Sequence, residues 1–526
     1  MTYNVVFSKI AFRAVISLAF SGAWFAAVAQ TPCENLKSLP LSNITITTAE
    51  SVAAGPFHAP QAPARGDARG DARGPARGPA RGGAPALMLP AYCRLAMVLT
   101  PSADSHIEME LWLPASGWNG KFQAVGNGGW AGSITFPAMA QALKEGYATA
   151  SNDTGHTGQD PVFALGHPEK LVDFAYRADH DMTVQSKALI NAFYGRATKL
   201  SYWNGCSTGG RQGLMEAQRY PDDFDGIVAG APANPQTHLH AWDMMVATTI
   251  LRDDKHFVSR AKLATVNKAV LAACDTLDGV KDGLLNDPRK CHFDPAVLLC
   301  KGADSDECLT APQVDAVKLV YSAAKKKDGE LIFPGKERGG ELAWPQLNPA
   351  KAPLALSQGT FQYATYQDPN WDWHTFDLDR DTAAADEKFG YVNASPDLSA
   401  FKAHGGKLLL YHGWNDQLIS PENTINYYNS VLKKMGPARQ DSWVRLYMVP
   451  GMTHCQGGPG PDQFNKMAAI ERWRESNTAP AEITAYHVTG NTVDMSRPLC
   501  PYPQVATYKG VGSTSDAANF ACRLPK

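Results

Sequence analysis

One serine lies in a glycine-rich turn that suits nucleophilic chemistry. Ser207 is part of the run Gly205-Cys206-Ser207-Thr208-Gly209-Gly210. An apolar stretch at 200–204 predicts a strand before it, and 211–217 predicts the start of a helix after it. Strand, sharp turn and helix are the context that raises a G-x-S-x-G serine above a sheet, and the glycines avoid collisions with the neighbouring strand and helix. An ordinary glycine-rich loop is the alternative interpretation.

An acid and a base for this serine follow two later predicted strands. Asp416 comes after the apolar run 407–411, and His454 follows the run 444–449. Each residue alone is as easily explained as a polar residue in a surface loop. The chain order serine, aspartate, histidine, with each residue after a strand, is nevertheless the order of α/β-hydrolases. In such a triad His454 takes the proton of the weakly nucleophilic hydroxyl, and Asp416 orients the imidazole.

An oxyanion formed during attack on an ester needs two backbone N–H donors. One is expected from Thr208, directly after the nucleophile. The other is expected from the glycine-rich loop 126–129, where Gly128 is the first choice and Gly129 the second.

The pattern of strands and helices predicts an α/β-hydrolase core with a large inserted lid domain. Strands alternate with helices up to about residue 233, and the alternation resumes at about 401. Between these points the chain is irregular and rich in aspartate and tryptophan. We therefore expect the core in two parts, 30–233 and 401–526, with a lid at 234–400 over the carboxyl edge of the sheet, where α/β proteins bind ligands.

The first 29 residues have the pattern of a signal peptide. Lys9 and Arg13 precede an apolar stretch, and Ala27-Val28-Ala29 is a small-residue cleavage site. An uncleaved anchor helix is the alternative, but the apolar run is short for a membrane span. The sequence thus predicts a secreted or periplasmic protein with no membrane partner after cleavage.

Composition narrows the range of partners. The formal net charge of −2 argues against a nucleic-acid partner. Residues from about 60 to 85 repeat Ala-Arg-Gly-Asp and Pro-Ala-Arg-Gly units without large aliphatic or aromatic side chains, so we expect a disordered surface loop there. The sequence gives no indication of oligomeric state.

The chain contains ten cysteines, and export makes disulfides the expected state for them. Proximity in sequence favours three local pairs, Cys274–Cys291, Cys300–Cys308 and Cys500–Cys522. Cys206 and Cys455 adjoin Ser207 and His454, so a triad would bring them close enough for a disulfide between the loops of the nucleophile and the base. A zinc site is the alternative, but no C-x-x-C spacing occurs.

Together these residues resemble the tannase and feruloyl esterase family, which includes enzymes that cleave mono(hydroxyethyl) terephthalate. The resemblance extends over nearly the whole mature chain and rests on Cys206-Ser207 with His454-Cys455 and on the segments 205–210, 230–233, 367–371 and 413–416. It implies a serine esterase with a lid, a disulfide between the catalytic loops and a structural calcium ion. Its cysteine pattern implies the pairs Cys33–Cys93, Cys206–Cys455, Cys274–Cys291, Cys300–Cys308 and Cys500–Cys522.

A calcium site also has support in the sequence itself. The segment 274–284 places three carboxylates at short spacing among glycines, and oxygen-rich loops suit this hard cation. A solvated acidic turn is the alternative. The resemblance implies that calcium binds the side chains of Asp275, Asp278 and Asp282 and the backbone carbonyls of Val280 and Leu284. No organic cofactor is expected.

The substrate is expected to be a small aromatic ester. The terephthalate-cleaving relative is understood to hold a free carboxylate with a lid arginine, but residues 357–375 contain none here. Feruloyl esters are therefore expected first, with galloyl esters or a terephthalate monoester as alternatives. His412, four residues before Asp416, is expected to contact the substrate. An inert binding protein and a peptidase on the same fold are the other function classes.

Overall fold

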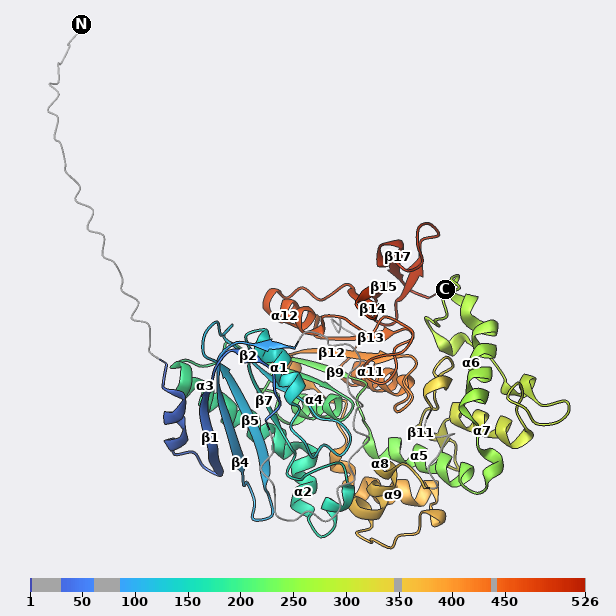
Figure 1. Ribbon diagram of the computed structural model, residues 1–526, viewed down its shortest axis with the longest axis horizontal. Coiled ribbons are helices and arrows are strands. Elements are labelled where there is room, and N and C mark those ends of the chain that lie inside the picture. The colour runs from blue at the N-terminus through green and yellow to red at the C-terminus, as the bar shows by residue number, and fades with distance from the viewer. Residues whose placement is uncertain (2–29, 61–85, 345–351, 437–441, 526) are drawn as a thin grey trace.

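The computed structural model describes residues 1, 30–60, 86–344, 352–436 and 442–525 (Figure 1). The signal-peptide prediction beyond Met1 and the low-complexity prediction at 61–85 lie outside these residues. A nine-stranded mixed sheet forms the centre of the molecule. In spatial order its strands are β1 (Ile44–Val52), β4 (Tyr92–Leu99), β5 (Ile107–Pro114), β7 (Ala148–Asn152), β6 (Lys121–Val125), β8 (Leu200–Cys206), β9 (Gly226–Gly230), β12 (Lys407–Gly413) and β13 (Val444–Val449).

The strands from β7 to β13 run parallel, whereas β1, β4 and β5 form an antiparallel edge. Every residue of β9 and β12 is buried, as expected for strands covered on both faces. Successive side chains alternate between the two faces. Leu408 and Leu410 therefore join one hydrophobic cluster, while Leu409 and Tyr411 join another.

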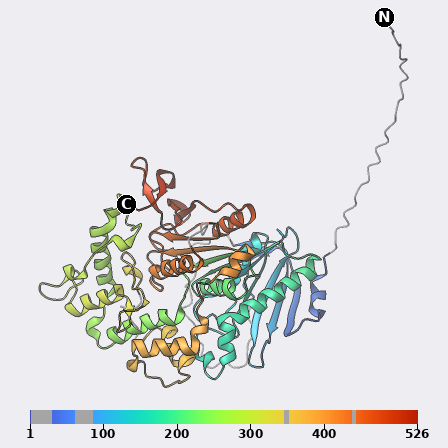
Figure 2. The same ribbon diagram turned by 180° about the vertical axis from the view of Figure 1, so that it is seen from behind.

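Helices cover both faces of the sheet (Figures 1 and 2). One face packs against α3, α4 and α11, and the opposite face against α1 and α12. The bounds of these helices are α1 (Phe136–Lys144), α3 (Ala178–Tyr194), α4 (Thr208–Arg219), α11 (Pro421–Met435) and α12 (Lys466–Ser476). This layered arrangement confirms the predicted α/β-hydrolase fold.

The chain between β9 and β12 leaves the sheet and forms a largely separate hydrophobic cluster, which runs from Ala233 to Ala385 and also includes Ile419. Because β9 pairs directly with β12, this long insertion does not interrupt the sheet. Its elements are α5 (Gln236–Ile250), α6 (Arg260–Cys274), α7 (Ala311–Tyr321), β10 (Ala324–Lys325), β11 (Leu331–Phe333), α8 (Ala355–Gly359), α9 (Leu378–Phe389) and α10 (Ser399–His404).

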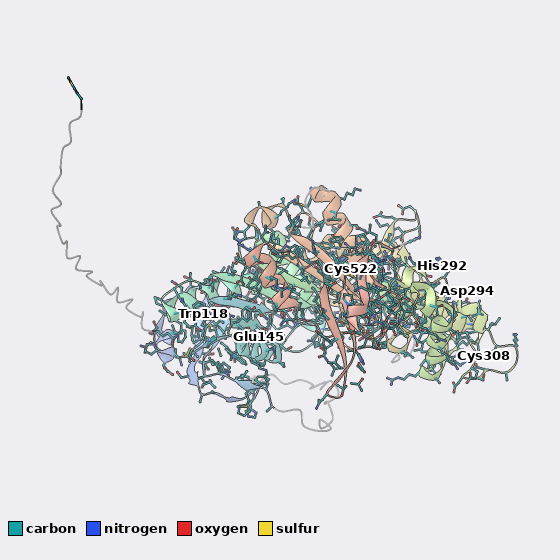
Figure 3. All side chains as sticks on the ribbon, turned by 90° about the horizontal axis from the view of Figure 1, so that it is seen from above. Trp118, Glu145, His292, Asp294, Cys308 and Cys522 are labelled. Atoms are coloured by element: carbon teal, nitrogen blue, oxygen red, sulfur yellow. A yellow bond between two sulfur atoms is a disulfide. The ribbon has the colours of Figure 1, made fainter. Side chains whose placement is uncertain are left out.

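Short elements complete the described chain. They are β2 (Gly55–Pro56), β3 (Met88–Leu89), α2 (Pro168–Val172), β14 (Ile483–Thr489), β15 (Thr492–Leu499), β16 (Val505–Tyr508) and β17 (Phe520–Arg523). Seen from above, His292, Asp294 and Cys308 of the insertion lie toward one end of the molecule, and Trp118 and Glu145 toward the other (Figure 3). Within the described residues no helix has the length and hydropathy of a membrane span.

All five disulfides implied by the resemblance are present, and no cysteine is free. Four of them close loops of 60 residues or fewer, whereas Cys206–Cys455 spans 249 residues and joins the two halves of the core. In the chain-entropy model, a disulfide that closes such a long loop removes more conformational entropy from the unfolded chain than the four disulfides that close shorter loops.

Candidate active site

Ser207 occupies a tight turn between β8 and α4. Its φ of 64° and ψ of −124° are unfavourable for a residue with a side chain, so surrounding bonds must hold this conformation in place. The Ser207 N–H donates to the carbonyl of Gly230 at 3.0 Å, and the Ser207 carbonyl accepts from the N–H groups of Arg211 and Ala233, each at 3.1 Å. The end of β9 and the first turn of α4 thus fix the serine.

The glycines around Ser207 are needed because backbone segments approach closely. A Cβ atom on Gly205 would lie 2.3 Å from the Gly209 carbonyl oxygen, and one on Gly210 would lie 2.4 Å from that of Gly230. Real side chains cannot approach this closely, so the turn requires glycine at both positions. The structure therefore confirms that the glycines of this turn avoid collisions with neighbouring backbone.

Asp416 and His454 lie in contact at the carboxyl ends of β12 and β13. His454 Nδ1 lies 2.7 Å from Asp416 Oδ2, and the backbone N–H groups of Leu418 and Ile419 donate to Oδ1 at 2.8 Å each. Burial alone would raise the pKa of Asp416, but the neighbouring His454 and His412 hold it well below its usual range. The carboxylate therefore stays ionised and can orient the imidazole of His454.

His412 lies behind Asp416, which corrects the expectation that it contacts substrate. Its side chain has no exposed surface. Its Nε2 lies 3.0 Å from Asp416 Oδ2, and its Nδ1 lies 2.7 Å from Thr424 Oγ1. Both ring nitrogens are engaged inside the protein because the side chain points from fully buried β12 toward α11. His412 is thus a positioning residue for Asp416.

The Cys206–Cys455 disulfide joins the residue before Ser207 to the residue after His454. The two cysteine Cα atoms lie 5.9 Å apart. The N–H of His454 also donates to Gln417 Oε1 at 3.0 Å, which ties the loop after β13 to the loop of Asp416. The three residues expected to act together are therefore linked by one disulfide and a short set of hydrogen bonds.

A cavity of about 50 Å³ opens beside Ser207. It lies between the core loops and helices α5 and α8 of the insertion. Its lining residues are Gly129, Trp130, Ser207, Thr208, Ala233, Gln236, Leu239, His240, Asp243, Leu354, Leu356, Leu418 and Ile419. Most of these side chains are apolar, as in sites for small organic ligands.

The two glycines considered for the oxyanion differ in position. Gly129 lines the cavity with Ser207 and Thr208, whereas Gly128 does not. Thr208 Oγ1 donates to the Gly129 carbonyl at 2.6 Å, which fixes this loop against the turn. A Cβ on Gly129 would lie 2.2 Å from Gln159 Oε1. The geometry thus favours Gly129 over Gly128, the first choice from sequence.

One wall of the cavity contains a polar side chain, Asp243, that the sequence did not predict. Asp243 Oδ2 accepts a hydrogen bond from Ser357 Oγ at 2.7 Å. Nearby, Lys336 donates to the Leu418 carbonyl at 2.6 Å, and burial lowers its pKa to about 8 despite the charges of Asp243 and Asp416. Burial, and next the charge of Arg211, lower the pKa of His240 to about 3. No local motif marks these residues, because packing of the insertion brings them together.

Known proteins of similar sequence indicate the class of reaction that this site performs. The model of the tannase and feruloyl esterase family matches residues 93–523. This chain belongs to that family. An uncharacterised esterase of Xanthomonas campestris is 36% identical over 96% of this chain and 94% of its own. A protein of Aspergillus terreus described as a "probable feruloyl esterase B-2" is 36% identical over 82% of this chain and 86% of its own.

A solved structure agrees with these relatives. The crystal structure of feruloyl esterase B from Aspergillus oryzae has a TM-score of 0.84 at 33% identity, covering 94% of this chain and all of that one. The protein is therefore a carboxylic ester hydrolase of the tannase and feruloyl esterase family, acting on small-molecule esters. The family favours ester hydrolysis over the peptidase and the inert binding protein that the sequence left open.

The loop expected to bind calcium in this esterase has an all-oxygen donor set. Asp275 accepts from the N–H groups of Asp282 and Gly283, and Asp278 accepts from that of Val280. Burial and then the charges of Asp282 and Asp275 raise the pKa of Asp278 to about 6. Within the described chain neither the Val280 nor the Leu284 carbonyl accepts a hydrogen bond. These groups fit a hard cation, although Asp282 also pairs with Arg497.

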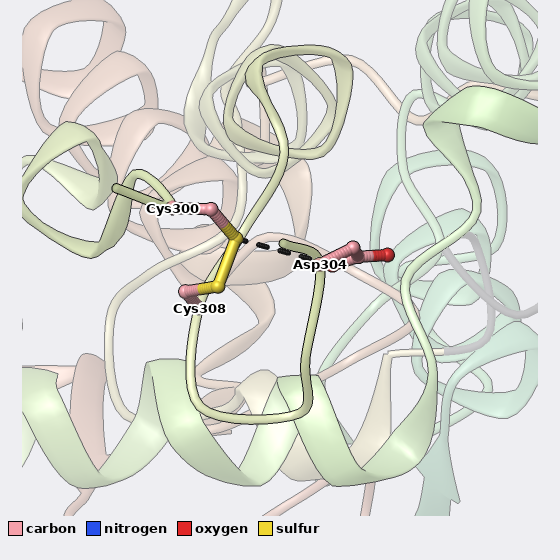
Figure 4. Close-up of side chains that lie close together, drawn as sticks. All are labelled: Cys300, Asp304 and Cys308. Atoms are coloured by element: carbon pink, nitrogen blue, oxygen red, sulfur yellow. Dashed lines mark hydrogen bonds between the residues drawn. A yellow bond between two sulfur atoms is a disulfide. The ribbon is translucent and has the colours of Figure 1, made fainter. Parts of the chain in front are cut away.

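A second group in the insertion is unsuited to a metal. Cys300, Asp304 and Cys308 lie together (Figure 4). The two sulfur atoms are bonded to each other, so neither is available as a thiolate ligand. Asp304 is paired with Lys262. The prediction that the cysteines form disulfides and not a zinc site is thus confirmed for this pair.

Removal of the Cys206–Cys455 disulfide should impair activity more than folding. We expect Cys206→Ala with Cys455→Ala to lower kcat by roughly 100-fold, because small misplacements of reacting groups have effects of this size. Turnover of an aromatic ester and far-UV circular dichroism would be measured together. Cys300→Ala with Cys308→Ala is the matched control and should retain kcat. Full kcat in the first variant would contradict the positioning role.

Replacement of His412 should separate positioning from substrate contact. We expect His412→Ala to lower kcat with little change in KM and to reduce the free energy of unfolding by about 1–3 kcal/mol, since Asp416 loses a buried donor. His412→Gln, which retains an N–H donor, should recover part of kcat. Steady-state kinetics and denaturant unfolding check this, and a rise in KM at unchanged kcat would indicate substrate contact instead.

Proposed function

We propose that this protein is a secreted serine esterase that hydrolyses esters of phenolic acids, with feruloyl esters preferred. The observation that carries the proposal is the buried, ionised Asp416 holding His454 beside the disulfide-linked turn of Ser207. Ser207 acts as the nucleophile, His454 as base and acid, and Asp416 as the residue that orients His454.

The proposed reaction has two halves. His454 takes the proton of the Ser207 hydroxyl as Oγ attacks the ester carbonyl. The backbone N–H groups of Thr208 and Gly129 donate to the developing oxyanion, with Gly128 as the alternative second donor, and the N-terminus of α4 favours the negative charge. His454 then protonates the leaving alcohol, which leaves an acyl-enzyme on Ser207. Water, deprotonated by His454, releases the acid and restores the serine.

The cavity supports a phenolic acyl group. Apolar side chains such as Trp130, Leu239 and Ile419 provide surface for an aromatic ring. Asp243 supplies a carboxylate that can accept a hydrogen bond from a phenolic hydroxyl but repels a second acid group. This favours feruloyl or galloyl esters over a terephthalate monoester, and the name of the Aspergillus terreus relative favours feruloyl esters first.

We also propose that the insertion acts as a lid and that the protein is exported. Helices α5 and α8 of the insertion line the cavity, so their position controls access to Ser207. Five disulfides are typical of proteins that mature outside the reducing cytosol, in agreement with the signal peptide expected at 1–29.

Substrate preference tests the proposed function. We expect kcat/KM to be higher on methyl ferulate than on methyl gallate or mono(hydroxyethyl) terephthalate, with all activity lost in Ser207→Ala. Equal activity in that variant would reject the proposed nucleophile, and dominant terephthalate activity would reject the proposed substrate class.

Asp243→Asn tests the phenol contact within the same assay. Methyl cinnamate lacks the phenolic hydroxyl and is the matched substrate. Because hydrogen bonds to charged groups contribute about 1.5–3 kcal/mol, the ratio of kcat/KM for methyl ferulate to that for methyl cinnamate should fall roughly 10-fold or more. An unchanged ratio would place the phenol elsewhere.

Calcium in the loop 275–284 is proposed to be structural, held by Asp275, Asp278, Asp282 and the carbonyls of Val280 and Leu284. Its removal would restore the repulsion among three neighbouring carboxylates, of which Asp282 is paired with Arg497. Chelator treatment of the purified protein should therefore release calcium and lower Tm, and added calcium should restore Tm. Elemental analysis and calorimetry check this, with Asp278→Asn as the variant expected to lose both effects. A calcium-free protein of unchanged Tm would contradict the site.

A further inference from the structure

Three metal-ligating side chains meet at the end of α4 that lies away from Ser207. They are His180 of α3, Glu216 of α4 and Asp223 of the following loop, and one ligand atom of each lies within 4.8 Å of the others. None of the three lines the cavity beside Ser207. The cluster is therefore separate from the ester-cleaving site.

Glu216 is the unusual member of this cluster. The residue is 1% exposed, and among the described residues neither of its carboxylate oxygens has a hydrogen-bond partner. Buried polar groups are nearly always hydrogen-bonded, and an ionised carboxylate without a partner is strongly destabilising. Because one of its oxygens lies within 4.8 Å of a ring nitrogen of His180 and of a carboxylate oxygen of Asp223, a cation shared among the three would satisfy it.

His180 and Asp223 provide a route for an ion to enter. Their side chains are 28% and 12% exposed, and His180 Nδ1 lies 2.6 Å from Asp223 Oδ2. The imidazole also stacks on Tyr220 with ring centroids 3.6 Å apart, which fixes the direction of Nδ1. Because His180 Nδ1 and Asp223 Oδ2 lie within hydrogen-bond distance of each other, they would have to move slightly apart to bind an ion between them.

The two nearby cationic side chains, Lys187 and Arg211, make their hydrogen bonds to backbone carbonyls. Lys187 Nζ donates to the backbone carbonyl of Asp223 and lies 3.9 Å from Asp223 Oδ1, whereas His180 contacts Oδ2. The buried Arg211 uses its Nη atoms on the carbonyls of Phe174, Ala175 and Val392. Neither cation makes a hydrogen bond to Glu216.

We propose that His180, Glu216 and Asp223 bind a divalent transition-metal cation of the Zn²⁺ class. One imidazole nitrogen with two carboxylates is a donor set that zinc accepts, with water in the fourth position. Calcium prefers all-oxygen sites, so this cluster differs in chemistry from the loop 275–284. The ion would join α3 to the end of α4, the helix that begins directly after Ser207, and would act on stability.

The alternative is a proton shared between the carboxyl groups of Glu216 and Asp223. Glu216→Gln separates the two accounts, since the amide mimics a protonated acid but is a poor metal ligand. A shared proton predicts that this variant is as stable as the parent protein. The metal site predicts that it loses both zinc binding and the associated stabilisation.

The experiment uses the full mature, oxidised protein after chelator treatment, loaded with ZnCl₂ and desalted. We expect one zinc equivalent per chain and a higher Tm than in the metal-free protein. Loss of a residue that only supports a metal ligand lowers metal affinity roughly 10–100-fold, so loss of the ligand itself in Glu216→Gln should lower zinc affinity by more than this. His180→Gln, at a partly exposed position, repeats the test if Glu216→Gln does not fold. Asp304→Asn and Asp278→Asn are controls that should retain the zinc equivalent.

Zinc binding that is the same in the parent protein and in both ligand variants would show that the metal binds elsewhere. No zinc uptake by the parent protein, together with unchanged Tm in Glu216→Gln, would establish the shared proton instead.

Discussion

The buried charge of Asp416 is the constraint on which the site depends. An ionised carboxylate inside a protein is tolerated only when hydrogen-bond donors surround it. Asp416 receives donors from His454, from His412 and from the two N–H groups that follow it in its own turn. Its neighbour Asn415 donates to the Gly339 carbonyl at 2.7 Å, so the same turn also anchors the insertion. This one polar centre contacts His454, supports its own turn and anchors the insertion.

The second requirement is that distant parts of the chain meet at Ser207. The strained turn is held by bonds to β9 and α4, and the disulfide to Cys455 brings in the loop after β13. The insertion lies between these parts in sequence, yet β9 and β12 remain direct neighbours in the sheet. The sheet is therefore continuous across the insertion, and helices α5 and α8 of the insertion line the cavity beside Ser207.

Residues governed by short-range rules were predictable from the sequence. Ser207, Asp416 and His454 each follow a buried strand, so strand prediction was enough to place them at one edge of the sheet. The disulfide pairs also matched the pattern implied by the family. By contrast, His412 was assigned to the wrong side of Asp416, because spacing along a strand and its turn does not reveal which neighbours a side chain meets.

The walls of the pocket were beyond prediction for a related reason. Asp243, Lys336 and Ser357 come from separate elements of the insertion and meet only through its packing. Gly129, and not Gly128, lines the cavity beside Ser207, and the hydrogen bond from Thr208 that fixes this loop follows from no spacing rule. Features formed by neighbouring residues can be predicted, whereas the polar wall of the cavity at Asp243 depends on a contact with Ser357, 114 positions along the chain.

The central claim is that an ester is cleaved through an acyl group on Ser207. The most direct measurement is mass spectrometry of protein mixed with methyl ferulate and quenched in acid within the first turnovers. The account predicts a feruloyl adduct on the peptide that contains Ser207, absent in Ser207→Ala. Turnover that persists in Ser207→Ala, or an adduct on another residue, would contradict it.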